Sequence, residues 1–290
     1  MNPLRDPAAR ARIYELFDAT WPGMENAIHA SEAAGAVWHE QSVAFVAWDG
    51  PKAVAHAGVM EFPVVLDGVR TRVSGIHAVC TRPEYRMKGL SRRLVMEALA
   101  HSATRTKTSI LGTGDSLLYT RYGFRAIPQT LFEAPAPRVD PGGDRFRPLS
   151  GSSPDDLHLL HRLLEARAPL SRTLASVDPG WLFIIDEMLS GRGKFKRLHY
   201  APDLDAVAAY VIVERTLKLY DVVAARIPSL SEIVSRLGVG IDRVELHFTP
   251  DVMDAPGAKP IASVIDDELM AIGPFPPEGK PLVLPPLARC

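Results

Sequence analysis

The segment of this sequence best suited to binding a phosphate group is Arg86-Met87-Lys88-Gly89-Leu90-Ser91. It follows an apolar, β-prone run from Val73 to Thr81 and opens a helix-period run that begins at Leu90. A strand that leads through a cationic turn into a helix presents unpaired backbone N–H groups and the positive end of the helix dipole to an anion. Gly89 permits close backbone approach, and the small Ser91 leaves the next position open.

A second motif lies downstream. The β-prone run Thr108 to Leu111 is followed by Gly112-Thr113-Gly114-Asp115 and then by Leu118-Tyr119-Thr120-Arg121-Tyr122-Gly123-Phe124. Together the two motifs resemble the core of the GNAT acetyltransferases, in which R/Q-x-x-G-x-G/A follows the fourth strand and F-Y-x-x-x-G-F follows the fifth. The resemblance covers residues 52–127. It departs from the family pattern at Ser91, where Gly or Ala is usual, and this departure concerns cofactor affinity rather than fold.

The resemblance implies an α/β (α+β) fold, with a mixed central sheet flanked by helices, and an acetyl-CoA-dependent N-acetyltransferase that passes the acetyl group directly to an amine. No metal is implied. Val79 and Thr81 would contact the pantetheine arm through their main chain, and the Val79 N–H would also polarise the thioester carbonyl. The pyrophosphate would bind the turn at Arg86, Lys88, Gly89, Leu90 and Ser91, although Lys88, Arg92 and Arg93 also suit a solvated helix face.

Tyr119 matches the family tyrosine that protonates the departing CoA thiolate. The alternative is a packed aromatic side chain beside Tyr122 and Phe124. We expect Gly123 and Phe124 to turn the chain into the last strands.

The general base is less clearly indicated. His77 lies two residues before Val79, and an unperturbed histidine titrates close to neutrality, which suits proton removal from an ammonium group. The alternative is a histidine satisfied within the core. The carboxylates of Glu61, Glu40 and Asp115 are further candidates.

Composition indicates an ordinary globular protein of two domains: the chain has 290 residues, 47% of them hydrophobic, and a net charge of −1. Without a basic excess we expect no nucleic-acid partner. The two cysteines, Cys80 in an apolar strand and Cys290, support neither a disulfide framework nor a metal site. Without a long apolar run we expect no membrane association and a cytoplasmic location.

The first half is expected to form one domain over residues 1–134. Its predicted elements are a helical region over 8–34, broken at Trp21-Pro22-Gly23, then strands at 42–48 and 53–62, a hairpin at 64–70, a strand at 73–81, a helix at 90–103, a strand near Ile110 and a short helix near Tyr119.

A Pro- and Gly-rich stretch predicts a linker over 135–148, followed by a second domain over 149–290. Helices are expected at 153–167, 181–189 and 228–237, and strands at 196–200, 206–214, 217–224, 243–248 and 268–272. This order repeats that of the first half, but Arg226-Ile227-Pro228-Ser229-Leu230 stands where a cofactor turn belongs. The second domain is therefore expected to be a degenerate GNAT-like domain, which leaves one active site per chain.

Tandem domains of this kind are similar to the Eis-like group, whose third domain this chain is too short to contain. In that group the C-terminal carboxylate reaches the active site, which implies the same role for Cys290. The acceptor is expected to be a small-molecule or peptide amine, and a homo-oligomer is possible. The alternatives are a non-catalytic acyl-CoA-binding or regulatory module, and a second half that is a ligand-binding fold unrelated to GNAT.

Overall fold

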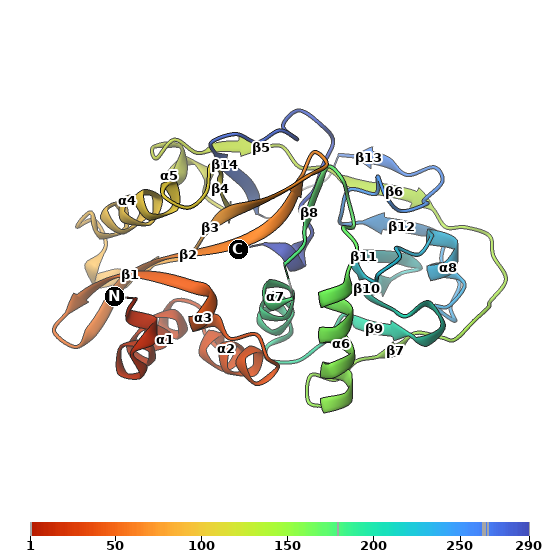
Figure 1. Cartoon of the computed structure of the whole chain (residues 1–290), viewed down its shortest axis with the longest axis horizontal. Helices are drawn as coiled ribbons and strands as arrows, with labels where there is room; N and C mark the ends of the chain where they lie inside the picture. Colours follow the sequence, from red (N-terminus) through yellow and green to blue (C-terminus); the bar gives the residue numbers. More distant parts are fainter. Residues whose placement is uncertain (1, 179, 263–264, 266, 290) are drawn as a thin grey trace.

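The computed structural model describes residues 2–178, 180–262, 265 and 267–289. Two mixed β-sheets lie side by side, with helices packed around and between them (Figure 1). The first sheet runs in the order β1 (Ser42–Asp49), β2 (Lys52–Leu66), β3 (Val69–Thr81), β4 (Ser109–Thr113), β14 (Glu268–Ile272) and β5 (Arg125–Ile127), with β8 (Leu174–Ser176) paired to β2.

The second sheet repeats the arrangement of the first. Antiparallel strands lead to one parallel pair, β11–β12, as β1 to β3 lead to the parallel pair β3–β4. Its order is β13 (Lys259–Ile261), β6 (Leu131–Pro135), β12 (Arg243–Leu246), β11 (Thr216–Val223), β10 (Ala206–Val213), β9 (Leu198–Ala201) and β7 (Arg147–Pro148).

The two halves exchange one strand each. β6 follows the first-half strands in sequence but pairs with β12 and β13, whereas β14, near the end of the chain, pairs with β4 and β5. The expected linker over 135–148 therefore does not separate the strands of the two sheets. The strand predicted at 268–272 exists, but it lies in the first sheet.

The first sheet is covered on both faces. α1 (Pro7–Thr20), α2 (Met24–Ala33) and α3 (Trp38–Gln41) lie on one face, and α4 (Leu90–Ala103) and α5 (Ser116–Thr120) lie on the other (Figure 1). Because both faces are covered, β2 is apolar and buried along most of its length. Ala53 and Met60 join the cluster on the α1 side, and Ala55 and Val59 join the cluster on the α4 side.

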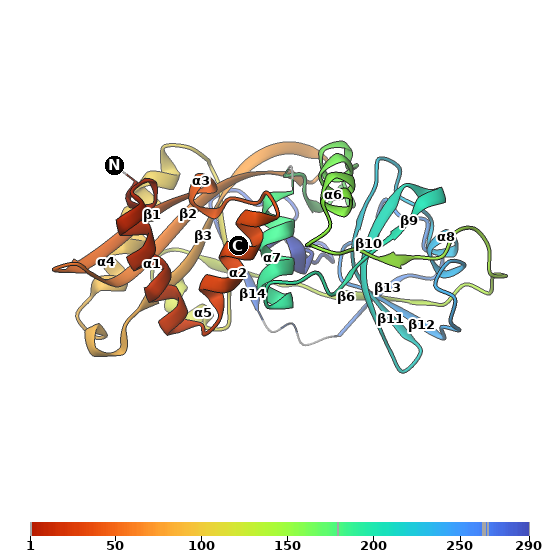
Figure 2. The same cartoon turned by 90° about the horizontal axis from the view of Figure 1, so that it is seen from below.

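The helices of the second half are α6 (Pro154–Ala166), α7 (Trp181–Gly191) and α8 (Leu230–Val234). α7 packs against α2 of the first half, and both views show the two helices side by side (Figures 1 and 2). α7 has a hydrophobic side chain at each of its first five positions, 181–185, and all five are buried. At the position of the cofactor helix α4, the second half has only the five-residue α8.

Most predicted elements are present with shifted ends. The break at Trp21-Pro22-Gly23 separates α1 from α2, and Ser229 with Glu232 forms the predicted capping box of α8. The expected strand 53–62 and the first arm of the 64–70 hairpin are one strand, β2, which continues through Pro63 to the Asp67–Gly68 turn. The short elements α3 and β8 were not predicted.

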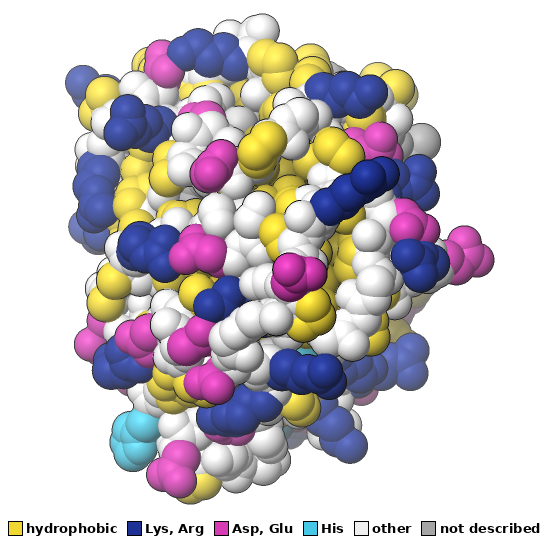
Figure 3. Space-filling view, turned by 90° about the vertical axis from the view of Figure 1, so that its right-hand side faces the viewer, with side chains coloured by type: hydrophobic (Ala, Val, Ile, Leu, Met, Phe, Trp, Pro, Cys, Tyr) yellow, Lys and Arg dark blue, Asp and Glu magenta, His cyan; other side chains and the backbone are white. Residues whose placement is uncertain are grey.

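The outer face of the second half carries side chains of both charges intermixed (Figure 3). Several of its arginines form ion pairs, among them Arg215 with Asp242 and Arg236 with Asp203. In the described part of the chain, no helix is long and apolar enough to span a membrane.

Candidate active site

The predicted phosphate turn is an open, uncapped helix N-terminus. Gly89 is the N-cap of α4 with φ of +74°, and no side chain caps the helix. A Cβ atom at Gly89 would meet nothing within 4 Å, so the space beside the backbone is open. The first N–H groups of α4 are therefore presented to an anion without a competing side-chain acceptor.

Two predicted cations lie beside this turn. The Arg86 Nε donates to the Thr81 carbonyl oxygen at 3.2 Å, and the Lys88 Nζ lies 4.7 Å from the centre of the Tyr85 ring. Both side chains are exposed, whereas Leu90 and Ser91 are half-buried. Met87, between the two cations, is fully exposed and also has a positive φ, of +61°. A bulky residue rarely adopts this conformation, and such strain gathers at functional loops.

β3 and β4 diverge beside this turn. Among the described residues they pair only through Ser74–Ser109 and Gly75–Ile110. The rest of β3, which includes Val79 and Thr81, lies beyond this pairing. The Thr81 hydroxyl oxygen is buried and has no hydrogen-bond partner in the described structure. A strand edge left open in this way can pair with an extended amide-containing ligand.

The backbone of β3 is irregular at the centre of this opening. The register against β2 shifts between the pairs Gly58–His77 and His56–Cys80, so Ala78 and Val79 together oppose one residue. Ala78 has a φ of +48°, in the left-handed region that an alanine adopts only at a cost. The His56 Nδ1 donates to the Ala78 carbonyl oxygen at 2.7 Å.

Tyr119 lies on α5, whose N-cap is Asp115. Its ring packs edge-on against Tyr122 and Phe124, in the same apolar cluster that Val79 and Leu90 contact. Burial, followed by the nearby Tyr122, Asp115 and Cys80, raises the pKa of Tyr119 to about 12. Its phenol therefore keeps its proton at neutral pH.

His77 lies on the opposite face of β3 from that cluster. Its ring is edge-on to Trp38, with centroids 5.1 Å apart, and its Nε2 lies 2.9 Å from the Ser42 hydroxyl. Its Nδ1 is buried without a hydrogen-bond partner in the described part of the chain. Burial, and then the neighbouring His56, lower the pKa of His77 well below its ordinary value, so the ring is neutral at pH 7.

A cavity of about 920 Å³ opens beside His77 and Ala78. Its walls come from the α1–α2 turn, α2, Trp38, Met60 and, in the second half, α7. The cofactor strand and the second half thus meet at one space.

The other proposed bases do not line this cavity. Glu61 lies 3.8 Å from both Arg72 and Arg105, Glu40 is exposed on α3, and Asp115 accepts the Leu118 N–H at the start of α5. Glu61 is thus near two arginines, Glu40 faces solvent and Asp115 caps a helix, so none of the three is placed beside the cavity.

Sequence reasoning did not find His56, Ser42, Trp181 or Asp186 as candidate site residues. Ser42 contacts His77 and His56 contacts Ala78, and only the fold brings these residues together. Trp181 and Asp186 lie on the α7 segment, far along the chain from the cofactor turn, and no local pattern links the two segments. The sequence offered one local signal for the cavity, namely the break at Pro22–Gly23 in the first helical region. Both residues of this break line the cavity.

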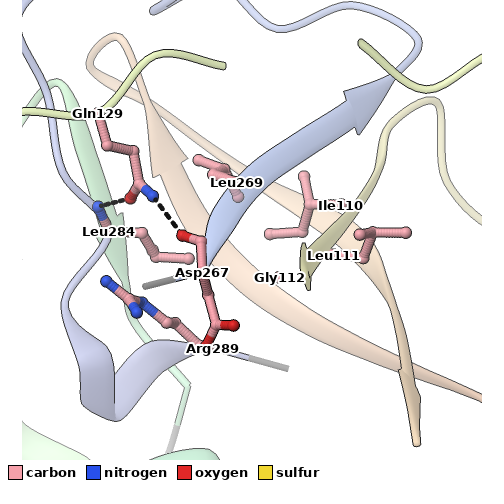
Figure 4. Close-up of a pocket in the computed structure, with 8 residues that line it drawn as sticks. All are labelled: Ile110, Leu111, Gly112, Gln129, Asp267, Leu269, Leu284 and Arg289. Carbon is pink, nitrogen blue, oxygen red and sulfur yellow. Dashed lines mark hydrogen bonds between the residues drawn. The ribbon is translucent and has the colours of Figure 1, made fainter. Parts of the chain in front are cut away.

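A much smaller pocket, of about 10 Å³, lies between β4, β14 and the end of the chain (Figure 4). The Gln129 side chain bridges it by donating to the Asp267 carbonyl oxygen at 3.3 Å and accepting the Leu284 N–H at 3.0 Å. It has room for about one water molecule. Asp267 and Arg289 line both this pocket and the large cavity.

Cys80 is not placed as a nucleophile. Cys80 is buried, and burial raises the pKa of its thiol to about 12. Cys290 lies outside the described residues, while its neighbour Arg289 lines the cavity. No group of three or more metal-ligating side chains occurs in the part of the chain that the structure describes.

Comparisons with solved structures identify the fold. A conserved protein of unknown function from Enterococcus faecalis, described as a probable N-acyltransferase, is 15% identical with a TM-score of 0.59, covering 91% of this chain and 69% of its own. A GCN5-related N-acetyltransferase from Anabaena variabilis is 15% identical with a TM-score of 0.54, covering 92% and 70%. Eis1 from Mycobacterium abscessus is 17% identical with a TM-score of 0.50, covering 84% and 70%.

At these identities the likeness concerns the fold, and about 30% of each of these proteins has no counterpart in this chain. A comparison with curated protein sequences finds no match. Residues 7–127, however, match the acetyltransferase (GNAT) domain family, and this range contains both the Arg86–Ser91 turn and Tyr119. The first half of the chain therefore carries a domain of the GNAT acetyltransferase superfamily.

Proposed function

We propose that this protein transfers the acetyl group of acetyl-CoA directly to an amine. The observation that carries the proposal is the position of Ala78. It belongs to the part of β3 that β4 leaves unpaired, and it also lines the large cavity. An acyl group held along β3 would therefore face a space that admits a second substrate.

The residues present fit acetyl-CoA. The uncapped N-terminus of α4 and the exposed Arg86 and Lys88 suit the pyrophosphate, and the open space at Gly89 lets the phosphate approach the backbone. The unpaired part of β3 offers main-chain groups at Val79 and Thr81 to the pantetheine amides. Bound there, acetyl-CoA supplies an activated acyl group as a thioester.

The chemistry needs one bond formed and one broken. The amine nitrogen attacks the thioester carbonyl carbon, the C–S bond breaks, and the sulfur leaves as a thiolate that requires a proton. The Tyr119 phenol, protonated at neutral pH, supplies that proton. The bulge at Ala78 orients the Val79 N–H to stabilise the oxyanion formed on attack.

The acceptor must lose a proton before it attacks. His77 lines the cavity, is held by Ser42 and is neutral at pH 7, so its ring has a site for this proton, directly or through water. Burial lowers the pKa of His77 and makes it a weak base, so we propose that it passes the proton on to solvent rather than keeping it. The acceptor is a small-molecule or peptide amine.

The test is to incubate the protein with acetyl-CoA and a panel of primary amines, and to measure free thiol and N-acetylated product together. Equal amounts of both, with at least one amine, support the proposal. Binding of acetyl-CoA without thiol release for any amine would instead support a non-catalytic acyl-CoA-binding module. Absence of binding would overturn both.

A further inference from the structure

The walls of the large cavity are unusually rich in tryptophan. Three of the four tryptophans of the chain line it, namely Trp21, Trp38 and Trp181. They come from separate segments: the α1–α2 turn, the start of α3 and the start of α7 in the second half. Trp38 and Trp181 are nearly buried, whereas Trp21 is 40% exposed.

Aliphatic side chains complete these walls. Met24 and Met60 come from the first half, and Leu182, Ile185 and Leu189 come from α7. The two halves thus present apolar surface to the same space. An apolar group that leaves water for such walls is stabilised in proportion to the area it buries.

The charged groups at the cavity do not favour a polycation. Among the described residues of the lining, Asp186 and Asp267 are accompanied by Arg192 and Arg289, so these residues contribute two groups of each sign. A ligand with several positive charges gains no net attraction from such a lining. A ligand with one ammonium group needs only one carboxylate.

Asp186 is suited to that ammonium group. Its Oδ2 accepts a hydrogen bond from Arg197 Nη2 at 3.1 Å, and its Oδ1 accepts none within the described residues. The side chain is 24% exposed and lines the cavity among the apolar residues of α7. Aromatic rings line the same space, and an ammonium group over the face of such a ring gains cation–π attraction.

We propose that the acceptor is a primary amine carried on an aromatic or bulky aliphatic group, with the apolar group held by the tryptophan-lined walls and the ammonium group by Asp186. The inference rests on the proposed acetyl transfer and names the class of its second substrate. The second half acts in this reaction as the acceptor-binding wall.

The experiment compares 2-phenylethylamine, ethylamine and spermidine as acceptors by kcat/KM, and as ligands by calorimetry. We expect kcat/KM for 2-phenylethylamine to exceed that for ethylamine by about tenfold or more, because a buried ring adds apolar area. Spermidine should resemble ethylamine. A preference for spermidine, or equal values for all three amines, would overturn the inference.

Trp21→Ala and Trp48→Ala are a matched pair, because both side chains are 40% exposed but only Trp21 lines the cavity. Trp21→Ala should remove most of the preference for 2-phenylethylamine, and Trp48→Ala should leave it unchanged.

Asp186→Asn should raise KM for 2-phenylethylamine about tenfold with little change in kcat. Asp242→Asn, an ion-paired carboxylate outside the cavity, is its control. Equal effects within either pair would contradict the assignment.

The binding measurement separates the two proposals. If no amine is acetylated but 2-phenylethylamine binds more tightly than ethylamine, and Trp21→Ala weakens that binding, the cavity inference stands while acetyl transfer fails. If acetylation occurs without the apolar preference, acetyl transfer stands and the inference fails. Equal binding of the two amines overturns the inference in either case.

Discussion

The His56 Nδ1 donates a hydrogen bond of 2.7 Å to the carbonyl oxygen of Ala78, the residue of β3 that has a φ of +48°. A left-handed alanine costs about 1 kcal/mol, and a buried hydrogen bond offsets a cost of that size. Gly58 makes room for this arrangement, since a Cβ there would lie 2.5 Å from the His77 ring and 3.0 Å from the His56 ring. We therefore propose that His56 is a positioning residue for the bulge that precedes Val79.

Replacing His56 tests that role. His56→Phe keeps the ring volume but removes the donor, and we expect kcat to fall about tenfold with little change in KM for acetyl-CoA, since only the oxyanion contact is misplaced. His56→Gln, which restores an N–H donor, should recover part of the rate. A loss of thermal stability in His56→Phe with unchanged kcat would contradict the positioning role.

Tyr119→Phe removes the proposed proton donor while keeping the packed ring. We expect kcat to fall about 100-fold and acetyl-CoA affinity to stay within about twofold, because the phenol acts on the leaving thiolate. Calorimetry and thiol release measure the two quantities. Tyr122→Phe is the control on the same segment and should retain activity; equal losses in both variants would indicate a packing role.

Gly89→Ala tests the phosphate turn, and Gly68→Ala is its matched control. Gly89 has φ of +74° and Gly68 φ of +81°, and a Cβ at either position would meet nothing within 4 Å. Each substitution should cost about 1 kcal/mol of folding stability. Only Gly89→Ala should weaken acetyl-CoA binding, by about tenfold, since only there does the Cβ occupy the path of the phosphate. Equal affinities in the two variants would place the phosphate elsewhere.

Asp186 makes a pH-dependent contribution to stability. Burial raises its pKa from 3.8 to about 6 in the folded protein, although Arg197 acts in the opposite direction. The folded state therefore binds more protons between these values, and the contribution of Asp186 to stability is lost as the pH rises through 6. Asp186→Asn should accordingly raise the free energy of unfolding by about 1–2 kcal/mol at pH 7.5, and by less at pH 4. Denaturant unfolding at both pH values measures this; a destabilised variant at pH 7.5 would contradict it.

The Arg86–Ser91 turn at the start of α4 and the short helix that carries Tyr119 could be predicted because their signals are local, whereas their roles in binding and catalysis stay predictions. Gly89, the left-handed N-cap of α4, lies close in sequence to the cations Arg86 and Lys88. The order of strand, turn and helix can be recognised from the sequence without knowledge of the fold. The capping box at Ser229 and Glu232 could be predicted for the same reason.

The strand exchange and the cavity could not be predicted in this way. The residues of β14 favour a strand, but strand propensity does not specify which sheet the strand joins. Trp181 and Asp186 reach the cavity through the packing of α7 on α2, which involves segments far apart in sequence. The bulge at Ala78 is accompanied by a hydrogen bond from a neighbouring strand, and no feature of residues 73–81 alone indicates it.

We propose that one acetyl-CoA site, formed by the Arg86–Ser91 turn, serves acyl transfer in the whole chain. A calorimetric titration of the full chain with acetyl-CoA, repeated for Gly89→Asp, tests it most directly, since an added carboxylate at that position repels phosphate. We expect one molecule bound per chain, with both binding and product formation lost in Gly89→Asp. Two molecules per chain, or binding and transfer that survive in Gly89→Asp, would contradict it.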